Sequence, residues 1–280
     1  MIDKLHIELT TYCNAACPVC ARNEVGAFPL IHLSINKLEN ISQNILNKFK
    51  KIHVCGSYGD PILHPNFFEF LDYFIQNTTA IIEISTNGNP RKPEWWKTLG
   101  EKLGNRGHVI FGLDGLEDTH AVYRKNTDFN KIIENVIGFM SGGGHAWWQF
   151  IPFKHNEHQI IAAKKLSQKL GFKHFFLKDE RHPELFESWS KPRISFDEEQ
   201  SLDTIASRCL FSNGTVYMQA DGNFLPCCYI GNYTEKIWKY ENLTEKTVEL
   251  IENSLKNSWK STETAHPSCI RWCINRKINA

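Results

Sequence analysis

Two kinds of apolar pattern alternate along the first 180 residues. Short runs rich in β-branched and aromatic residues are typical of strands, whereas longer segments with apolar residues three and four apart are typical of amphipathic helices. The expected strands are residues 5–9, 51–55, 80–85, 108–113, 147–153 and 174–177. The expected helices are a segment capped by Ser34 that runs from Ile35 to Phe49, and residues 66–76, 93–103, 129–140 and 157–170.

This alternation predicts a parallel sheet whose strands are joined by right-handed helical crossovers. Periodicity alone does not separate an open doubly wound sheet from a barrel. Segments that could carry binding or catalytic residues follow the first four expected strands. In α/β folds the active site lies at the carboxyl ends of the strands. We therefore expect an α/β fold whose residues 1–190 form a partial (β/α)6 TIM-like barrel.

The pattern changes after residue 180. Residues 181–200 contain two prolines and many charges, which is typical of a linker. Residues 215–219 and 224–229 are apolar runs on either side of the turn Asp221-Gly222-Asn223, which predicts a β-hairpin. A helix is expected near residues 247–259, before a cysteine-bearing tail. We expect residues 191–280 to form a small α+β domain.

Composition narrows the class of protein. The chain has 280 residues, of which 41% are hydrophobic and 22% charged, so it is globular rather than disordered or fibrous. The 32 basic and 31 acidic residues leave a net charge of +1, which gives no overall attraction to nucleic acid or an anionic membrane. We find neither a membrane-length apolar run nor a signal-peptide pattern at the N-terminus. A cytoplasmic protein without membrane or nucleic-acid partners is expected.

Nine cysteines are unusual in such a composition. A secreted disulfide framework would come with a signal sequence and a small loop-rich chain, and this sequence shows neither. In a reducing compartment, clustered thiols indicate metal ligands or redox centres. Cys55 stands alone, and the other eight form one group near each end of the chain.

The first group lies directly after the first expected strand. Cys13, Cys17 and Cys20 have the spacing C-x3-C-x2-C. Three thiolates leave one iron of a four-iron cluster open for another ligand, in the way that catalytic zinc sites keep one position open. A zinc ion with a fourth ligand from elsewhere in the chain is the alternative.

This spacing, at the end of a first strand and ahead of βα units, resembles the radical S-adenosylmethionine (SAM) enzymes. Gly59-Asp60-Pro61 follows the second strand, where the family carries a Gly-Gly-Glu-Pro motif. Ser85-Thr86-Asn87-Gly88 ends the third strand and resembles the segment near the SAM ribose and carboxylate. Leu113-Asp114-Gly115, followed by Tyr123-Arg124, resembles the fourth-strand signature of members with an extra cluster domain.

The resemblance implies a set of ligands. Cys13, Cys17 and Cys20 would hold a [4Fe–4S] cluster that binds SAM, and Arg124 would pair with the SAM carboxylate. The cofactor-binding residues it implies are Gly59, Asp60, Pro61, Ser85, Thr86, Asn87, Asp114 and Arg124. One residue departs from the pattern, because the position before the third cysteine is often aromatic in the family and is Val19 here.

The second group resembles the opening of SPASM and Twitch domains, which follow a radical SAM barrel and hold auxiliary clusters. Twelve residues separate Cys209 from Gly222, and four separate Gly222 from Cys227. The resemblance implies one auxiliary [4Fe–4S] cluster on Cys209, Cys227, Cys269 and Cys273. Cys228 would point away from this cluster, since neighbouring side chains alternate along a strand. A structural zinc site with four cysteine ligands is the alternative, because spacing separates zinc poorly from iron–sulfur.

The chemistry implied by the resemblance is reductive cleavage of SAM to a 5′-deoxyadenosyl radical, with an electron donor such as flavodoxin or ferredoxin. We expect an oxidoreductase or isomerase in which the radical removes hydrogen from a small polar metabolite. One alternative is a peptide-modifying maturase that makes a thioether, a carbon–carbon crosslink or an epimerised residue. A zinc-stabilised binding protein without catalysis is the other.

Residues near the strand ends are candidates for the substrate side. The candidates are Cys55, Tyr58, Asp114, Lys154, His155 and Lys178. The Cys55 thiol could return a hydrogen atom to a substrate radical, or it could be a buried strand cysteine. Lys154 and His155 could bind an anionic group, or they could be an exposed pair on a loop.

Overall fold

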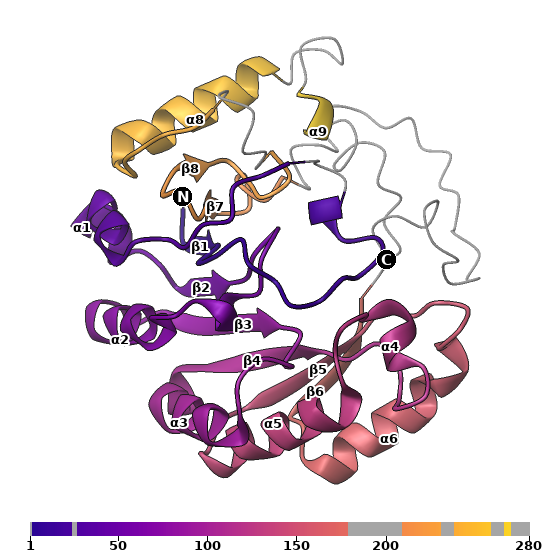
Figure 1. Ribbon diagram of the computed structural model, residues 1–280. Coiled ribbons are helices and arrows are strands. Elements are labelled where there is room, and N and C mark those ends of the chain that lie inside the picture. Colours follow the sequence, from indigo (N-terminus) through magenta and orange to yellow (C-terminus); the bar gives the residue numbers. More distant parts are fainter. Residues whose placement is uncertain (1, 24–26, 179–208, 231–237, 259–265, 270–280) are drawn as a thin grey trace.

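The computed structural model describes residues 2–23, 27–178, 209–230, 238–258 and 266–269, and these contain one eight-stranded sheet (Figure 1). Its strand order is β6-β5-β4-β3-β2-β1-β7-β8. Strands β1 to β7 are parallel, and β8 is antiparallel to β7. The strands are β1 (Lys4–Ile7), β2 (Lys51–Val54), β3 (Ile81–Thr86), β4 (Gly107–Gly112), β5 (Ala146–Phe150), β6 (His174–Leu177), β7 (Thr215–Met218) and β8 (Phe224–Leu225).

Helices cover the outer side of the curved sheet, with α2, α3, α5 and α6 in a row beside β2 to β6 (Figure 1). The helices are α1 (Gln43–Leu46), α2 (Phe67–Asn77), α3 (Pro93–Leu103), α4 (His120–Tyr123), α5 (Phe129–Ser141), α6 (Ile160–Leu170), α8 (Glu245–Ser258) and α9 (Pro267–Cys269). Short 3-10 helices span Ala21–Asn23, Ile35–Asn40, Pro61–Leu63, Gly104–Arg106 and Glu157–Gln159. The expected α/β fold with a parallel, partly closed barrel is confirmed.

The expected helix from Ile35 to Phe49 is wrong as a single element. The chain forms a 3-10 helix over Ile35–Asn40 and then α1, and Ile41 between them is extended. Ile41 forms a bridge with Leu243, and the Ser42 amide donates to the Leu243 carbonyl at 2.9 Å. This contact with a segment 200 residues away interrupts a pattern that locally favours a helix.

Alternate residues of the barrel strands face two different environments. Leu5, Ile7, Ile52 and Val54 are buried against the helices, as expected for parallel strands with covered faces. The residues between them face the inside of the barrel and keep partial exposure. The inner faces of β1 and β2 are therefore polar, and the apolar core lies between sheet and helices.

The C-terminal hairpin is part of the barrel sheet. Strand β7 pairs in parallel with β1, so that His6 lies opposite Tyr217. Gly222 in the hairpin turn has φ +87°, a conformation that favours glycine, and a Cβ there would lie 2.7 Å from the Lys37 side chain. The hairpin is confirmed; the expected domain boundary near residue 190 lies outside the described residues.

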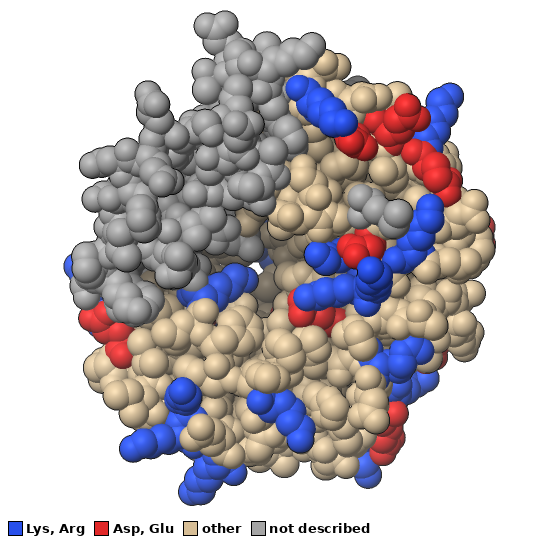
Figure 2. Space-filling view, turned by 180° about the vertical axis from the view of Figure 1, so that it is seen from behind, with Lys and Arg blue, Asp and Glu red and all other residues tan. Residues whose placement is uncertain are grey.

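The surface shows charges of both signs. Basic and acidic side chains both occur on the face shown in Figure 2. None of the helices in the described part of the chain combines the length and the apolar character needed to cross a bilayer.

Candidate active site

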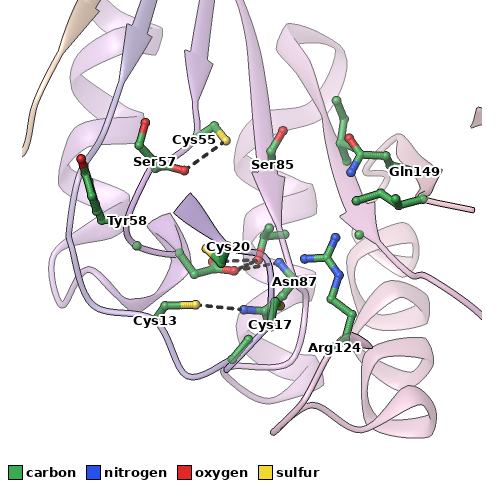
Figure 3. Close-up of a pocket in the computed structure, with 18 of the residues that line it drawn as sticks. Cys13, Cys17, Cys20, Cys55, Ser57, Tyr58, Ser85, Asn87, Arg124 and Gln149 are labelled. Carbon is green, nitrogen blue, oxygen red and sulfur yellow. Dashed lines mark hydrogen bonds between the residues drawn. The ribbon is translucent and has the colours of Figure 1, made fainter. Parts of the chain in front are cut away.

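A cavity of about 240 Å³ opens inside the barrel and reaches the carboxyl ends of the strands. Side chains from β1 to β5 and from the loops after them line it (Figure 3). The predicted site residues that line it are Cys13, Cys17, Cys20, Cys55, Tyr58, Gly59, Asp60, Ser85, Thr86, Asn87, Arg124 and Lys178. The structure thus brings together residues that are up to 165 positions apart in the sequence.

The three-cysteine loop forms one wall of this cavity. The Asn87 side-chain amide donates to Cys13 Sγ at 3.9 Å. Burial raises the pKa of the Cys13 thiol to about 12, and the charge of Asp60 acts in the same direction. Burial also raises the pKa of Cys17, although the neighbouring Arg124 guanidinium opposes this. Without bound metal these two thiols are therefore protonated at neutral pH, and metal binding must displace their protons.

The donor set fits a four-iron cluster. Among the described residues, no group of three His, Cys, Asp or Glu side chains is placed to hold a single metal ion. A cubane takes each thiolate on a different iron, so its ligands surround a volume instead of meeting at one point. Three thiols lining one cavity, with N–H donors of Asn87 and Arg124 beside them, match this requirement.

Asp60 joins the ends of β2 and β3. Its carboxylate accepts hydrogen bonds from Thr86 Oγ1 at 2.8 and 3.0 Å, and from the backbone amide of Asn87 at 2.7 Å. It also accepts from the Ile62 amide at 3.2 Å, which caps the 3-10 helix Pro61–Leu63. Burial raises the pKa of Asp60, and these hydrogen bonds oppose the rise. Asp60 is therefore an organising group that fixes Thr86 and Asn87 against the cysteine loop.

Gly59 permits the close approach of this turn to the cysteine loop. A Cβ at Gly59 would lie 1.9 Å from the Thr10 carbonyl oxygen, a distance that no side chain can occupy. The next amide, that of Asp60, donates to the Tyr12 carbonyl at 2.8 Å. The glycine of the predicted motif is thus required for backbone packing beside Cys13.

Asp114 and Arg124 form a buried ion pair behind the cavity wall. Arg124 Nε donates to Asp114 Oδ2 at 2.6 Å, and Asp114 Oδ1 accepts from the Ile151 amide at 2.6 Å. Burial would lower the pKa of Arg124, but the charges of Asp114 and Cys17 raise it well above its usual value. Asp114 does not line the cavity, whereas the outer nitrogens of Arg124 lie over Gly112 and face into it (Figure 3).

The lower part of the cavity holds residues that the sequence reasoning missed. His6, His53 and Gln149 line it, together with Ser85, Lys178 and Cys228. His53 Nε2 lies 2.9 Å from Ser85 Oγ, and the rings of His6 and His53 stack with centroids 4.9 Å apart. The signal that could have found them is a polar residue at every second position of otherwise apolar strands.

Glu8 was also missed. It is fully buried, and its carboxylate accepts from the Tyr58 amide at 2.7 Å and from the Tyr217 hydroxyl at 3.1 Å. It therefore ties the turn that carries Tyr58 and Gly59 to β1 and β7. A single carboxylate inside the apolar run LHIEL was the available signal.

Besides Asp114, three further candidates do not line the cavity. Pro61 is buried as the first residue of its 3-10 helix. Lys154 is exposed, and His155 stacks on Phe153 with ring centroids 5.4 Å apart. Val19, the departure from the family pattern, is buried with Tyr123, Ile151 and Phe153 in an apolar group beside the cysteine loop.

The second group of cysteines is partly assembled in the described residues. Cys227 and Cys269 share an apolar cluster, and Cys209 is also buried. Burial raises the pKa of Cys227, and the nearby Cys228, Cys269 and Cys209 raise it further. Cys228 lines the barrel cavity, which Cys227 does not, and it also packs against the cluster that holds Cys227 and Cys269. Because β8 ends at Leu225, the two cysteines do not lie on a strand, and the expected alternation of their side chains does not apply. Cys273 lies outside the described residues.

Comparison with known families identifies the class. Residues 7–158 match the model of the radical SAM superfamily, and the chain belongs to this superfamily. A search of curated proteins gave no match.

Solved structures support the same fold. SuiB from Streptococcus suis, bound to S-adenosylmethionine, is similar with a TM-score of 0.67 and 14% identity. The similarity covers 94% of this chain and 66% of SuiB, so the chain spans about two thirds of that protein. His6-tagged anSMEcpe with bound AdoMet has a TM-score of 0.63 and 16% identity over 98% of this chain and 85% of its own. SuiB has also been solved with the precursor peptide SuiA, and anSMEcpe with the Cp18Cys peptide.

Proposed function

We propose that this protein cleaves SAM reductively and uses the resulting radical to remove hydrogen from a small polar substrate, which is oxidised or rearranged. The observation that carries the proposal is the common cavity of the three-cysteine loop, the Gly59-Asp60 turn and the Ser85–Asn87 segment. Membership of the radical SAM superfamily supports it.

Each group of residues has a role in this proposal. Cys13, Cys17 and Cys20 would hold a [4Fe–4S] cluster, which together with SAM supplies a reducing electron and a hydrogen-abstracting radical. The outward nitrogens of Arg124 would bind the SAM carboxylate, and Asp60 holds Asn87 in place beside the cluster loop.

Other parts of the cavity would surround the reacting groups. Tyr123 and Ile151 form an apolar wall that would exclude water near the radical. Cys55 and Tyr58 line the cavity and are assigned to the substrate side. We place the protein in the cytoplasm, where its thiols would stay reduced and flavodoxin or ferredoxin could supply the electron.

We further propose an auxiliary [4Fe–4S] cluster on Cys209, Cys227, Cys269 and Cys273 in a Twitch-like domain. The burial of Cys209, Cys227 and Cys269 supports this assignment. Visible absorption of anaerobically purified protein distinguishes iron–sulfur from zinc, since iron–sulfur proteins have a broad band at roughly 400 nm. A colourless protein with bound zinc would refute both cluster assignments.

The central experiment measures 5′-deoxyadenosine after the reduced holoprotein is incubated with SAM. The triple substitution of Cys13, Cys17 and Cys20 by Ala should abolish the product and leave the auxiliary cluster in place. The retained cluster serves as the control for folding. Formation of 5′-deoxyadenosine by the triple variant would overturn the proposal.

A peptide substrate is the second candidate, and the similarity to SuiB and anSMEcpe favours it, because both have been solved with peptides. In this case the reaction would be thioether formation, carbon–carbon crosslinking or epimerisation. The products distinguish the candidates: thioether formation and crosslinking lower the mass of a peptide by the hydrogens removed, and epimerisation, which leaves the mass unchanged, is detected by chiral amino-acid analysis.

A further inference from the structure

Arg22 lies in the short 3-10 helix Ala21–Asn23, directly after the last cysteine of the three-cysteine loop. The backbone amide of Asn23 donates to the Cys20 carbonyl at 2.8 Å, and its side-chain amide donates to the Cys17 carbonyl at 2.8 Å. The turn that carries Arg22 is therefore fixed to the backbone of two predicted cluster ligands.

The guanidinium of Arg22 rests on an aromatic ring. Its central carbon lies 5.3 Å from the centroid of the Phe28 ring. Phe28 in turn packs against Tyr58, with ring centroids 4.9 Å apart, and Tyr58 is buried and lines the same cavity as Cys13. Contact with the ring of Phe28 uses the charge of the guanidinium but none of its N–H donors. The guanidinium is thus held near the cavity wall with its donors available.

One nitrogen of this guanidinium has no hydrogen-bond partner. Arg22 Nη1 is buried, and it donates to no acceptor in the described part of the chain. Buried charged donors without a partner are rare in folded proteins, because the loss of their hydrogen bonds to water costs free energy. The position of this nitrogen therefore indicates that the functional state of the protein holds a negatively charged or hydrogen-bond-accepting group beside it.

The charge of Arg22 acts on the cysteine loop. It lowers the pKa of Cys13, against the rise caused by burial and by the charge of Asp60. Arg124, whose charge also acts on this loop, is paired with Asp114 at 2.6 Å, so that its charge is largely balanced. Among the described residues, no carboxylate forms such a pair with Arg22. Arg22 is therefore the less compensated of these two positive charges.

The cluster proposed for the three cysteines is a suitable partner for this buried cation. A four-iron cluster on three thiolates is an anion, and its reduction adds a further negative charge. A neighbouring positive charge stabilises the reduced form more than the oxidised form, because the attraction grows with the charge of the cluster. An N–H donor directed at cluster sulfur acts in the same direction. Burial strengthens both effects, since little water screens them.

We propose that Arg22 raises the reduction potential of the cluster held by Cys13, Cys17 and Cys20, by placing a buried positive charge and a free N–H donor beside it. The inference rests on the proposed function, since it assumes this cluster. The step concerned is the transfer of one electron from the donor to the oxidised cluster. Arg22 is neither a ligand nor a lining residue of the cavity, so its role is to tune the cluster and not to bind the substrate.

A redox titration of the anaerobic holoprotein without SAM tests this, with the electron paramagnetic resonance signal of the reduced cluster as the readout. The relevant signal is the one that the triple substitution of Cys13, Cys17 and Cys20 by Ala removes. Arg22→Met should disfavour reduction about tenfold, which for one electron is a midpoint potential about 59 mV more negative. Arg22→Lys keeps the charge, and its equilibrium constant should stay within about threefold of the wild type.

Lys125→Met is the matched control. The Lys125 carbonyl accepts from the Ala16 amide at 3.0 Å, so its backbone contacts the same loop, but its side chain is exposed and its charge is screened. Its midpoint potential should equal that of the wild type. An unchanged midpoint in Arg22→Met would overturn the inference, as would an equal shift in Lys125→Met or in Arg22→Lys.

Iron content and visible absorption show whether each variant carries the cluster. If Arg22→Met does not load, Arg22→Lys is compared with Arg22→Gln, which is polar but uncharged and should be about tenfold harder to reduce. Equal midpoints in these two variants, or failure of all three Arg22 variants to load, would refute the role in the potential. A wild type without the signal that the triple substitution removes would contradict the proposed function itself, whereas an unshifted midpoint contradicts only the role of Arg22.

Discussion

Arg124 Nε lies 2.6 Å from Asp114 Oδ2, and the Asp114 side chain has no exposed surface. The pair joins the end of β4 to the segment after α4, and it directs the remaining N–H groups of Arg124 toward Cys17 and the cavity. Asp114 therefore acts on the cavity through Arg124, although the sequence suggested a direct role for Asp114 in cofactor binding.

We expect Asp114→Asn to destabilise the fold by about 3 kcal/mol, because it leaves the Arg124 charge buried without its partner. The control is Asp72→Asn, which breaks the exposed pair with Lys102 at 2.8 Å and should cost at most about 1 kcal/mol. Urea unfolding of the two variants measures the difference. Equal losses would show that the buried pair contributes no more than the surface pair.

Asp60→Asn should weaken SAM binding about tenfold, because the Asn side chain has one acceptor oxygen and places an NH2 donor where the carboxylate accepts from either the Ile62 or the Asn87 backbone amide. Thr86→Val removes one neutral donor and leaves the Asn87 bond in place, so its effect should be smaller. Calorimetric titration of each holoprotein with SAM measures both. A Thr86→Val effect as large as that of Asp60→Asn would contradict the organising role of the carboxylate.

The sequence predicted the barrel strands well, because β2 and β6 are short apolar runs between turns and helices. It failed where distant segments decide the structure. Ile41 is extended because it pairs with Leu243, and β7 joins the sheet because it pairs with β1. Neither contact leaves a local pattern, since the partners are about 200 residues apart in the chain.

The candidate site shows the same contrast between local motifs, which the sequence predicted, and long-range arrangements, which it did not. The cysteine loop and the Gly59-Asp60 turn are local motifs, and both line the cavity. His6 and His53 were missed because the alternation of polar and apolar residues places them on one face of the strands but does not by itself show that this face lines a cavity. The reverse applies to Lys154, whose position at a strand end suggested a role, but whose side chain is exposed.

His120 should make the stability of the fold fall as the pH is lowered from 7 to 5. The side chain is fully buried; its Nδ1 accepts from the Asp114 amide at 3.3 Å, and its Nε2 lies 3.0 Å from Thr127 Oγ1. Burial, together with the Arg124 charge, lowers its pKa to about 3 from 6.5. Below pH 6.5 the unfolded chain takes up a proton that the folded chain does not, so unfolding becomes easier.

At pH 5 this proton uptake by the unfolded chain should lower the free energy of unfolding by an amount on the order of 2 kcal/mol. His120→Asn keeps an acceptor for the Asp114 amide and has no proton to gain. It should be less stable than the wild type at pH 7, and the difference should shrink by about this amount at pH 5. Urea unfolding at the two pH values gives both numbers. A difference that does not change with pH would contradict a neutral, buried His120.

Cys227 and Cys228 are adjacent, but Cys228 lines the barrel cavity and Cys227 does not, which gives a matched test of the auxiliary cluster. Cys227 and Cys269 are buried in one apolar group, and Cys228 is partly buried at its edge. Cys269→Ala should therefore reduce the iron content from about eight to about four per chain, whereas Cys228→Ala should keep about eight. Iron analysis of the two anaerobically purified variants measures this difference. Full iron content in Cys269→Ala, or loss of four irons in Cys228→Ala, would show that the four ligands have been assigned wrongly.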